Sequence, residues 1–419
     1  MIPYIIYFIV SIFLEFIIII SSIFNVKIRK NYYSSYKQIF DSFKSLQNVQ
    51  GKKIILLHAA SAGEFEQLQP VLRQIDRKKY FIIQSFTSPT VYEINNNENL
   101  FDYKCYHPFD IFWISYMFFK ILKPEKYIIT RHDLWPGHIL NARRFKIPIY
   151  YINANVHKNS IWYNKTFNFF SKYFLEKIDY VIVPSEYLYN CVKEISQNIN
   201  VMIIQDTRYI QVFDKSKKIP ENTFNILSQI YNENIQNSIM VCGSIDNSDS
   251  LILTNLNQIL KYKKLIFVPH EVNKTYIKKI EKILNCQNIN YLKYSQLISD
   301  SDKKNKSLKK APSLLLVDII GILPYLYSFG TTAYIGGGFG RGVHSVLEPA
   351  VFGSRIICGP NIEMLDEAKE FKSQGFLHVV SQIEELINLI NHKNQFNFFF
   401  DSYLSNDNAM NEFIFETSN

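Results

Sequence analysis

The chain has 419 residues, enough for two or three domains, and its 47% hydrophobic and 20% charged residues exclude a disordered chain. Its formal net charge of +9 suits an anionic membrane surface or phosphorylated substrates, and is too diffuse to indicate nucleic acid binding, so no nucleic acid partner is expected. The five cysteines include no CxxC pair, which disfavours a disulfide framework or a zinc site and favours a reducing cytoplasm.

Residues 2–24 are apolar apart from Glu15 and a few polar residues. As a helix they would extend roughly 35 Å, against a hydrocarbon core of ~30 Å. No basic segment precedes them and no small-residue cleavage site follows, which argues against a cleaved signal peptide. Lys27, Arg29 and Lys30 come next, so the positive-inside rule leaves the body of the protein cytoplasmic. We predict that residues 1–30 form a membrane anchor in contact with lipids. Because Glu15 is costly at mid-membrane, both a single pass and an interfacial helix stay open.

From residue 53 to residue 208, short apolar runs alternate with helical patterns. This alternation predicts a parallel sheet with helices on both faces. Active groups of such sheets lie at the carboxyl ends of the strands. The polar residues that follow the predicted strands are His58, Ser61, Glu64, Arg131, Asp133 and Arg208.

A second alternating set begins near residue 238. Two Rossmann-like domains in series, facing a cleft, describe the GT-B architecture of many glycosyltransferases. We therefore predict an α/β chain with an N-terminal domain over 31–212, a linker over 213–236 and a C-terminal domain over 237–395. The last segment, 396–419, is expected to pack back on the N-terminal domain.

The segment HAASAGE (58–64) runs from a strand end into a helix. Ser61 and Glu64 fit the S-x-x-E pattern of a capping box, which is one interpretation of Glu64. The other is a general base for a substrate hydroxyl, because a first-turn carboxylate facing the cleft would be well placed for it. The helix N-terminus is expected to hold the pKa of Glu64 low.

Ten of the 14 glycines lie between residues 321 and 375. GGGFGRG (336–342) follows a strand, but it lacks the third glycine of a dinucleotide fingerprint and the GK[ST] of a P-loop. Backbone N–H groups of such a loop could still approach a phosphate. The predicted phosphate loop comprises Gly336, Gly337, Gly338, Gly340 and Gly342. Glu348 lies in the next helix. It either interacts with the dipole at the N-terminus of that helix or binds ribose hydroxyls.

No cluster has the spacing of a metal site, so no metal is expected.

The sequence contains, in chain order, the motifs HAASAGEFEQLQP, RHDLWP, VPSE, DTR and VPHE, followed by the block from residue 318 to 353. Together these motifs resemble the 3-deoxy-D-manno-octulosonic acid (Kdo) transferases of lipopolysaccharide assembly. The resemblance implies a GT-B enzyme at the cytoplasmic side of the inner membrane. It implies inverting, metal-independent transfer of Kdo from CMP-Kdo to the lipid A precursor (lipid IVA), with no cofactor.

The resemblance also implies roles for particular residues. Glu64 matches the general base, Arg208 the residue that stabilises the transition state, and Asp133 the acidic position before the Trp. The donor-binding positions that match are Pro269, His270, Ile320, Gly321, Ile322, Ser345, Val346, Leu347 and Glu348.

Four departures from the family pattern are present, the first of which is that Asp133 is shorter than the usual Glu. Ile322 stands where Glu is common, Arg131 where an acid or Lys is common, and residues 243–250 replace the usual Gly-Ser-Thr and acidic pair. Two alternatives therefore remain: a GT-B transferase with another nucleotide sugar, and a membrane-tethered homologue with an eroded site.

Overall fold

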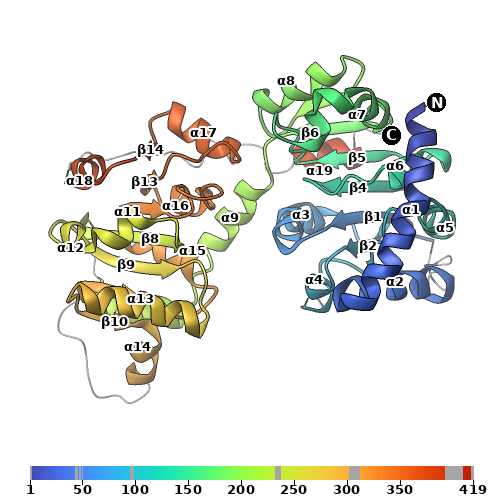
Figure 1. Ribbon diagram of the computed structural model, residues 1–419. Coiled ribbons are helices and arrows are strands. Elements are labelled where there is room, and N and C mark those ends of the chain that lie inside the picture. Colours follow the sequence, from blue (N-terminus) through green and yellow to red (C-terminus); the bar gives the residue numbers. More distant parts are fainter. Residues whose placement is uncertain are drawn as a thin grey trace. The chain divides into compact units, whose positions relative to one another are not determined.

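The computed structural model describes residues 2–42, 46, 49, 51–94, 99–231, 237–301, 312–391 and 409–416. The chain divides into two compact units (Figure 1). Unit 1 comprises Met1–Gln211 with Asn406–Asn419, and unit 2 comprises Val212–Ser405. The boundary falls inside helix α9 (Arg208–Ser216).

Unit 1 is built on a seven-stranded parallel sheet of order β3-β2-β1-β4-β5-β6-β7. Its central strands are nearly continuous runs of Ile, Leu, Val and Tyr because helices bury both faces of the sheet. The strands are β1 (Lys53–Ala59), β2 (Tyr80–Phe86), β3 (Tyr103–Tyr106), β4 (Lys126–Thr130), β5 (Ile149–Ile152), β6 (Tyr180–Val183) and β7 (Val201–Ile203).

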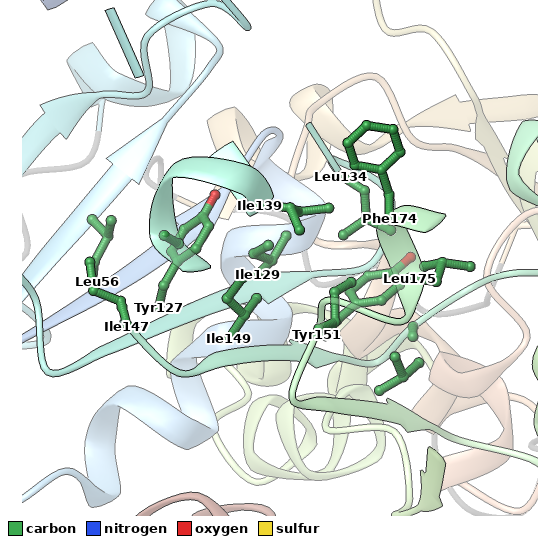
Figure 2. Close-up of a cluster of buried hydrophobic side chains, with 14 of the residues drawn as sticks. Leu56, Tyr127, Ile129, Leu134, Ile139, Ile147, Ile149, Tyr151, Phe174 and Leu175 are labelled. Atoms are coloured by element: carbon green, nitrogen blue, oxygen red, sulfur yellow. The ribbon is translucent and has the colours of Figure 1, made fainter. Parts of the chain in front are cut away.

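Two hydrophobic cores cover the two faces of this sheet, and successive strand residues enter them alternately. Leu56 lies in the core that Figure 2 shows, whereas Ile55 and Leu57 belong to the core on the other face. The helices that follow the strands are α3 (Ala62–Gln74), α4 (Pro89–Ile94), α5 (Phe112–Leu122), α6 (Pro136–Arg144), α7 (Asn168–Leu175) and α8 (Glu186–Ile195).

Two helices precede the sheet, α1 (Ile2–Phe24) and α2 (Val26–Lys37). Asn25 separates them in an extended conformation and caps α2 through its side chain. At the other end of the chain, α19 (Ala409–Asn411) and a π-helical turn (Glu412–Glu416) pack against unit 1, with Met410 and Ile414 in the core beside α3.

Unit 2 repeats the architecture with a parallel sheet of order β10-β11-β9-β8-β12-β13-β14. Its strands are β8 (Ile239–Ile245), β9 (Lys264–Pro269), β10 (Tyr291–Lys293), β11 (Leu314–Leu316), β12 (Thr332–Ile335), β13 (Arg355–Cys358) and β14 (Leu377–Val379). Its helices are α10 (Glu221–Ile230), α11 (Ser250–Thr254), α12 (Leu256–Ile259), α13 (Lys274–Cys286), α14 (Tyr294–Ser301), α15 (Leu323–Leu326), α16 (Leu347–Val351), α17 (Asp366–Ser373) and α18 (Ile383–Asn391).

The segment that we predicted as a linker, 213–236, contains the end of α9 and all of α10, while residues 232–236 lie outside the described residues. Of the predicted C-terminal segment, 396–408 and 417–419 lie outside them as well. All five cysteines are free thiols.

Candidate active site

The polar residues singled out in unit 1 surround the place where its strand order reverses, between β1 and β4. Ligands bind there in parallel α/β sheets because the loops of the two strands run to opposite faces. His58 lies near the end of β1, Glu64 in the first turn of α3, and Asp133 just after β4. Arg208 begins α9.

Glu64 caps its own helix. Its Oε2 accepts hydrogen bonds from the N–H groups of Ala60 (2.7 Å) and Ser61 (3.0 Å), and Ser61 Oγ accepts from the N–H of Glu64 (3.4 Å). The capping box that the sequence pattern indicates is therefore formed.

The Glu64 side chain is only 5% exposed, and this burial raises the pKa of its carboxyl group, with Asp133 as a further cause. The opposing effects of His58 and the two backbone N–H groups are smaller. Our expectation of a low pKa is thus wrong, because desolvation outweighs the helix terminus. A carboxylate with a raised pKa is a better proton acceptor.

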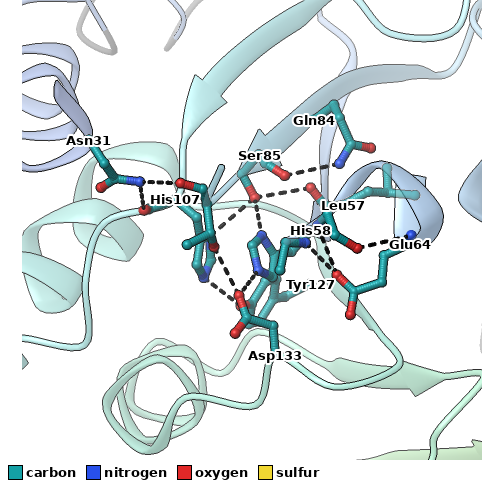
Figure 3. A network of polar contacts seen from close by, with 12 residues as sticks. Asn31, Leu57, His58, Glu64, Gln84, Ser85, His107, Tyr127 and Asp133 are labelled. Carbon is teal, nitrogen blue, oxygen red and sulfur yellow. Dashed lines mark hydrogen bonds and ion pairs between the residues drawn. The ribbon is translucent and has the colours of Figure 1, made fainter. Parts of the chain in front are cut away.

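The buried His58 pairs with the partly buried Asp133 beside Glu64 (Figure 3). His58 Nε2 lies 2.8 Å from Asp133 Oδ2, which also accepts from Thr87 Oγ1 at 2.9 Å. Burial alone would raise the pKa of Asp133, but these donors and a Trp135 hydrogen bond lower it. Asp133 is therefore ionised and only accepts, so the proton sits on His58 Nε2.

A chain of polar contacts runs from His58 through Ser85 and His107 to Tyr127 (Figure 3). Ser85 Oγ lies 3.1 Å from His58 Nδ1 and 3.1 Å from His107 Nδ1. His107 Nε2 lies 3.1 Å from the Tyr127 hydroxyl. The imidazole rings of His58 and His107 stack with their centroids 3.7 Å apart. This network fixes the rotamer of His58, and through it the position of Asp133.

Two guanidinium groups meet one turn along α3 from Glu64. With its amide oxygen turned toward them, Gln67 accepts hydrogen bonds from Arg131 Nη1 and Arg208 Nε, both at 2.9 Å. Arg208 also pairs with Asp206 at 2.8 Å. Arg131 adopts a left-handed backbone conformation with φ 64°, and its Nε donates to His132 Nε2 at 3.0 Å. Burial and Arg131 together lower the pKa of His132 to about 4, so this imidazole is neutral at pH 7.

The donor-site residues predicted in unit 2 follow β9, β11 and β12. Pro269 ends β9, and the N–H of His270 donates to the carbonyl of Ile245 at 2.9 Å. Gly321 has φ +94°, which explains a glycine there, and its neighbour Ile320 is 82% exposed. Ile322 is buried at the start of α15.

Leu347 and Glu348 begin α16, Val346 is its N-cap, and Ser345 precedes it. Val346 and Leu347 are 0% and 1% exposed, so their side chains belong to the core. Only their backbone groups remain available to a ligand. Glu348 lies in the first turn of this short helix.

The glycine-rich loop packs closely on its neighbours. A Cβ on Gly338 would lie 2.6 Å from the nitrogen of Gly359, and one on Gly336 would lie 2.2 Å from the carbonyl oxygen of Ser244. The N–H of Gly337 donates to the buried carboxylate of Asp249, and those of Gly340 and Gly342 to the carbonyl of Gly337. Close backbone packing thus accounts for several of these glycines, and their phosphate-binding role stays a prediction.

His270 stacks on His344, with ring centroids 4.2 Å apart and planes 14° from parallel. Burial, and then the neighbouring His270, lower the pKa of His344. Within the described parts of the chain, no group of three His, Cys, Asp or Glu residues could hold a metal ion.

Comparison with known proteins shows what the chain is similar to. A family model described as 3-deoxy-D-manno-octulosonic-acid transferase (kdotransferase) matches residues 34–211. The 3-deoxy-D-manno-octulosonic acid transferase of Aquifex aeolicus is 25% identical over 363 residues, which cover 83% of this chain and 89% of that protein. This chain is therefore similar to the Kdo transferases. A bifunctional glycosyltransferase/methyltransferase of Fusobacterium nucleatum is also 25% identical over 369 residues. The match covers 84% of this chain but only 54% of that protein, so the chain spans about half its length.

A solved UDP-GlcNAc 2-epimerase from Methanocaldococcus jannaschii has the same fold, with a TM-score of 0.57 at 17% identity over 87% of this chain and 99% of that one. The predicted GT-B fold class, with two Rossmann-like α/β domains, is confirmed. Sequence reasoning missed the residues that support the predicted site residues. They are Gln67, Ser85, His107, Tyr127, Asp206, Asp249 and His344. Asp249 carried a usable signal, because an acid in the loop after a strand is a candidate site residue.

Proposed function

We propose that this chain is a glycosyltransferase of the Kdo transferase family, and that it moves Kdo from CMP-Kdo to the lipid A precursor lipid IVA with inversion and without a metal ion. The main support is Glu64, a buried carboxylate of raised pKa within the segment that matches the family model. Its two backbone N–H donors hold one carboxyl oxygen, and they leave the other for a substrate hydroxyl.

In the proposed reaction, the acceptor hydroxyl oxygen attacks the anomeric carbon of Kdo while the bond from that carbon to the CMP phosphate oxygen breaks. The hydroxyl proton passes to Glu64, and CMP leaves with the electrons of the broken bond. Negative charge grows on the leaving phosphate, and a cation such as Arg208 stabilises it. Gln67 and Asp206 hold Arg208 in place for this role.

Unit 2 would bind the donor. His270 and the exposed loop at Ile320 are proposed for the cytidine, and Glu348 for the ribose. The stack of His270 on His344 supports an ordered ring at the end of β9, because each ring limits the rotation of the other.

For localisation we propose an interfacial anchor at the cytoplasmic face of the inner membrane. Pro3, Tyr7, Ser11, Ile18 and Ser22 of α1 are buried against unit 1 along the whole helix. This stripe favours a helix in the plane of the membrane, because a spanning helix would have to break these contacts.

The proposal is tested with purified full chain in detergent micelles, CMP-Kdo and lipid IVA. We expect a product heavier by one or more Kdo residues, the same rate in EDTA, and the inverted anomeric configuration by NMR. Transfer from a UDP-sugar alone would favour another donor, and no transfer from any donor would favour an eroded site.

A further inference from the structure

Helix α1 does more than attach the chain to a surface, because it forms one wall of a pocket in unit 1. The pocket has a volume of about 450 Å³, within the range of small-molecule sites. Its lining residues are Leu14, Ile18, Phe109, Asp110, Asp133, Leu134, Trp135 and Pro136. Six of these eight are apolar.

The helix is fixed against this pocket by specific contacts. The Tyr7 hydroxyl donates to Asp110 Oδ1 at 3.0 Å, and the N–H of Phe112 donates to Ser11 Oγ at 2.8 Å. Gly137 makes room for the first of these, since a Cβ there would lie 1.9 Å from the Tyr7 oxygen. The pocket wall is therefore part of the folded unit.

The remaining faces of α1 are exposed and apolar. Phe13 is 63% exposed and Ile17 is 58% exposed, and Glu15 is engaged by the Tyr32 hydroxyl at 3.4 Å. Trp113 of α5 and Phe169 of α7 add exposed rings on helices that contact α1. An apolar surface of this kind is covered by the acyl region of a bilayer.

Asp133 is one of the two acidic residues that line the pocket. Its carboxylate is hydrogen-bonded to His58 and Thr87, so these two partners compensate its negative charge at the pocket wall. An apolar molecule in the pocket would thus lie beside Asp133, which, with its partner His58, lies close enough to Glu64 to influence its pKa.

We infer that this pocket binds one acyl chain of the lipid acceptor, which enters from the bilayer along α1. The inference rests on the proposed function, because it identifies the occupant as the acceptor. A membrane phospholipid would gain the same burial, but only the acceptor would carry a hydroxyl group to Glu64. Each methylene buried is worth roughly fourfold in affinity, from about 0.8 kcal/mol per CH₂.

The first test fills the pocket in the full chain with Leu14→Trp. Transfer is measured to lipid IVA and to the same disaccharide without its acyl chains. If three methylenes are displaced, the ratio of the two kcat/KM values falls about 60-fold at fourfold for each CH₂. The matched control is Ile17→Trp, which places the same ring on an exposed face of the helix, and its ratio stays at the wild-type value. An unchanged ratio in Leu14→Trp, or an equal fall in both variants, overturns the inference.

The second test needs no variant. Lipid IVA with a diazirine at the end of one acyl chain is photolysed with wild-type protein, and the labelled peptides are identified by mass spectrometry. We expect label on the peptides of Leu14 and Trp135, displaced by unlabelled lipid IVA but not by excess phospholipid. Label only on exposed residues of α1, or equal displacement by phospholipid, overturns the inference. Failure of the proposed function has a different signature, since no acceptor, acylated or not, would then receive Kdo.

Discussion

Replacing Glu64 by Gln separates its two roles. Both backbone N–H groups bond to one carboxyl oxygen, at 2.7 and 3.0 Å, and the amide oxygen of Gln can accept both. The exchange turns two charge-assisted hydrogen bonds into neutral ones, which costs about 1 kcal/mol. It also removes the cost of ionising a buried acid, so the free energy of unfolding changes by ~1 kcal/mol or less.

Catalysis responds very differently. Loss of a positioned base lowers turnover by ~10²–10⁴-fold. At about 1.4 kcal/mol per tenfold in rate, this corresponds to roughly 3–5 kcal/mol of barrier. We therefore expect Glu64→Gln to lose nearly all turnover while its affinity for CMP-Kdo and its melting temperature stay near those of wild type.

The assay is transfer of Kdo to lipid IVA, with donor affinity by calorimetry and stability by urea unfolding. Glu385 provides a matched control, since its Oε2 accepts from the N–H groups of Ser381 (2.7 Å) and Gln382 (3.3 Å) at the start of α18. Glu385→Gln should keep full turnover. Ser61→Ala breaks the capping box but leaves the Glu64 carboxylate, so it should lose stability by about 1 kcal/mol and keep measurable turnover.

Turnover of Glu64→Gln within tenfold of wild type would refute the catalytic role and leave the capping role. The pH dependence gives an independent check. Because burial raises the pKa of Glu64 above its ordinary value of 4.5, the acid limb of the wild-type rate profile should lie above pH 4.5. A limb below that pH would contradict the assignment.

Three further predictions follow from other residues. Glu348→Ala should weaken CMP binding about 10-fold or more, as expected for a lost hydrogen bond to a charged group, and unchanged affinity in calorimetry would reject Glu348 as a ribose ligand. Burial raises the pKa of Asp110 to about 7 from an ordinary 3.8. Between these values the folded state binds the extra proton, so the free energy of unfolding should fall as pH rises, by up to ~1.4 kcal/mol per pH unit. Asp110→Asn should remove that slope in urea unfolding, and an unaltered slope would show that another group causes it. Gly137→Ala should cost about 1–3 kcal/mol of stability through the clash with Tyr7, whereas Gly63→Ala, where a Cβ meets nothing within 4 Å, should cost nothing; equal melting temperatures would disprove the docking of α1.

Much of the fold could be predicted because buried parallel strands leave unbroken apolar runs, as in β1 and β9. The edge strands β3, β10 and β14 have only three or four residues and leave no such run. Their pairing comes from neighbours in the sheet, which the local pattern does not encode. Helix α10 was missed for a related reason, because its polar surroundings suggested a connection.

The site divides in the same way. Glu64, Asp133 and Arg208 could be found because each follows a predicted strand. The contacts of His58 with Ser85 and of Gln67 with two arginines depend on strand order and on side-chain geometry, so spacing along the sequence does not reveal them. The raised pKa of Glu64 was mispredicted because its burial depends on the folded environment.

The return of the chain to unit 1 has a consequence for synthesis. Met410 and Ile414 complete a core that otherwise consists of residues before position 212, and Asn411 Nδ2 donates to the carbonyl of Val71 at 3.0 Å. On the ribosome, that core waits for the whole of Val212–Ser405 to be made, roughly 10–40 s at 5–20 residues per second. During this interval the apolar face beside α3 lacks its cover. The nascent domain therefore exposes apolar surface to which a chaperone could bind until Met410 and Ile414 are in place.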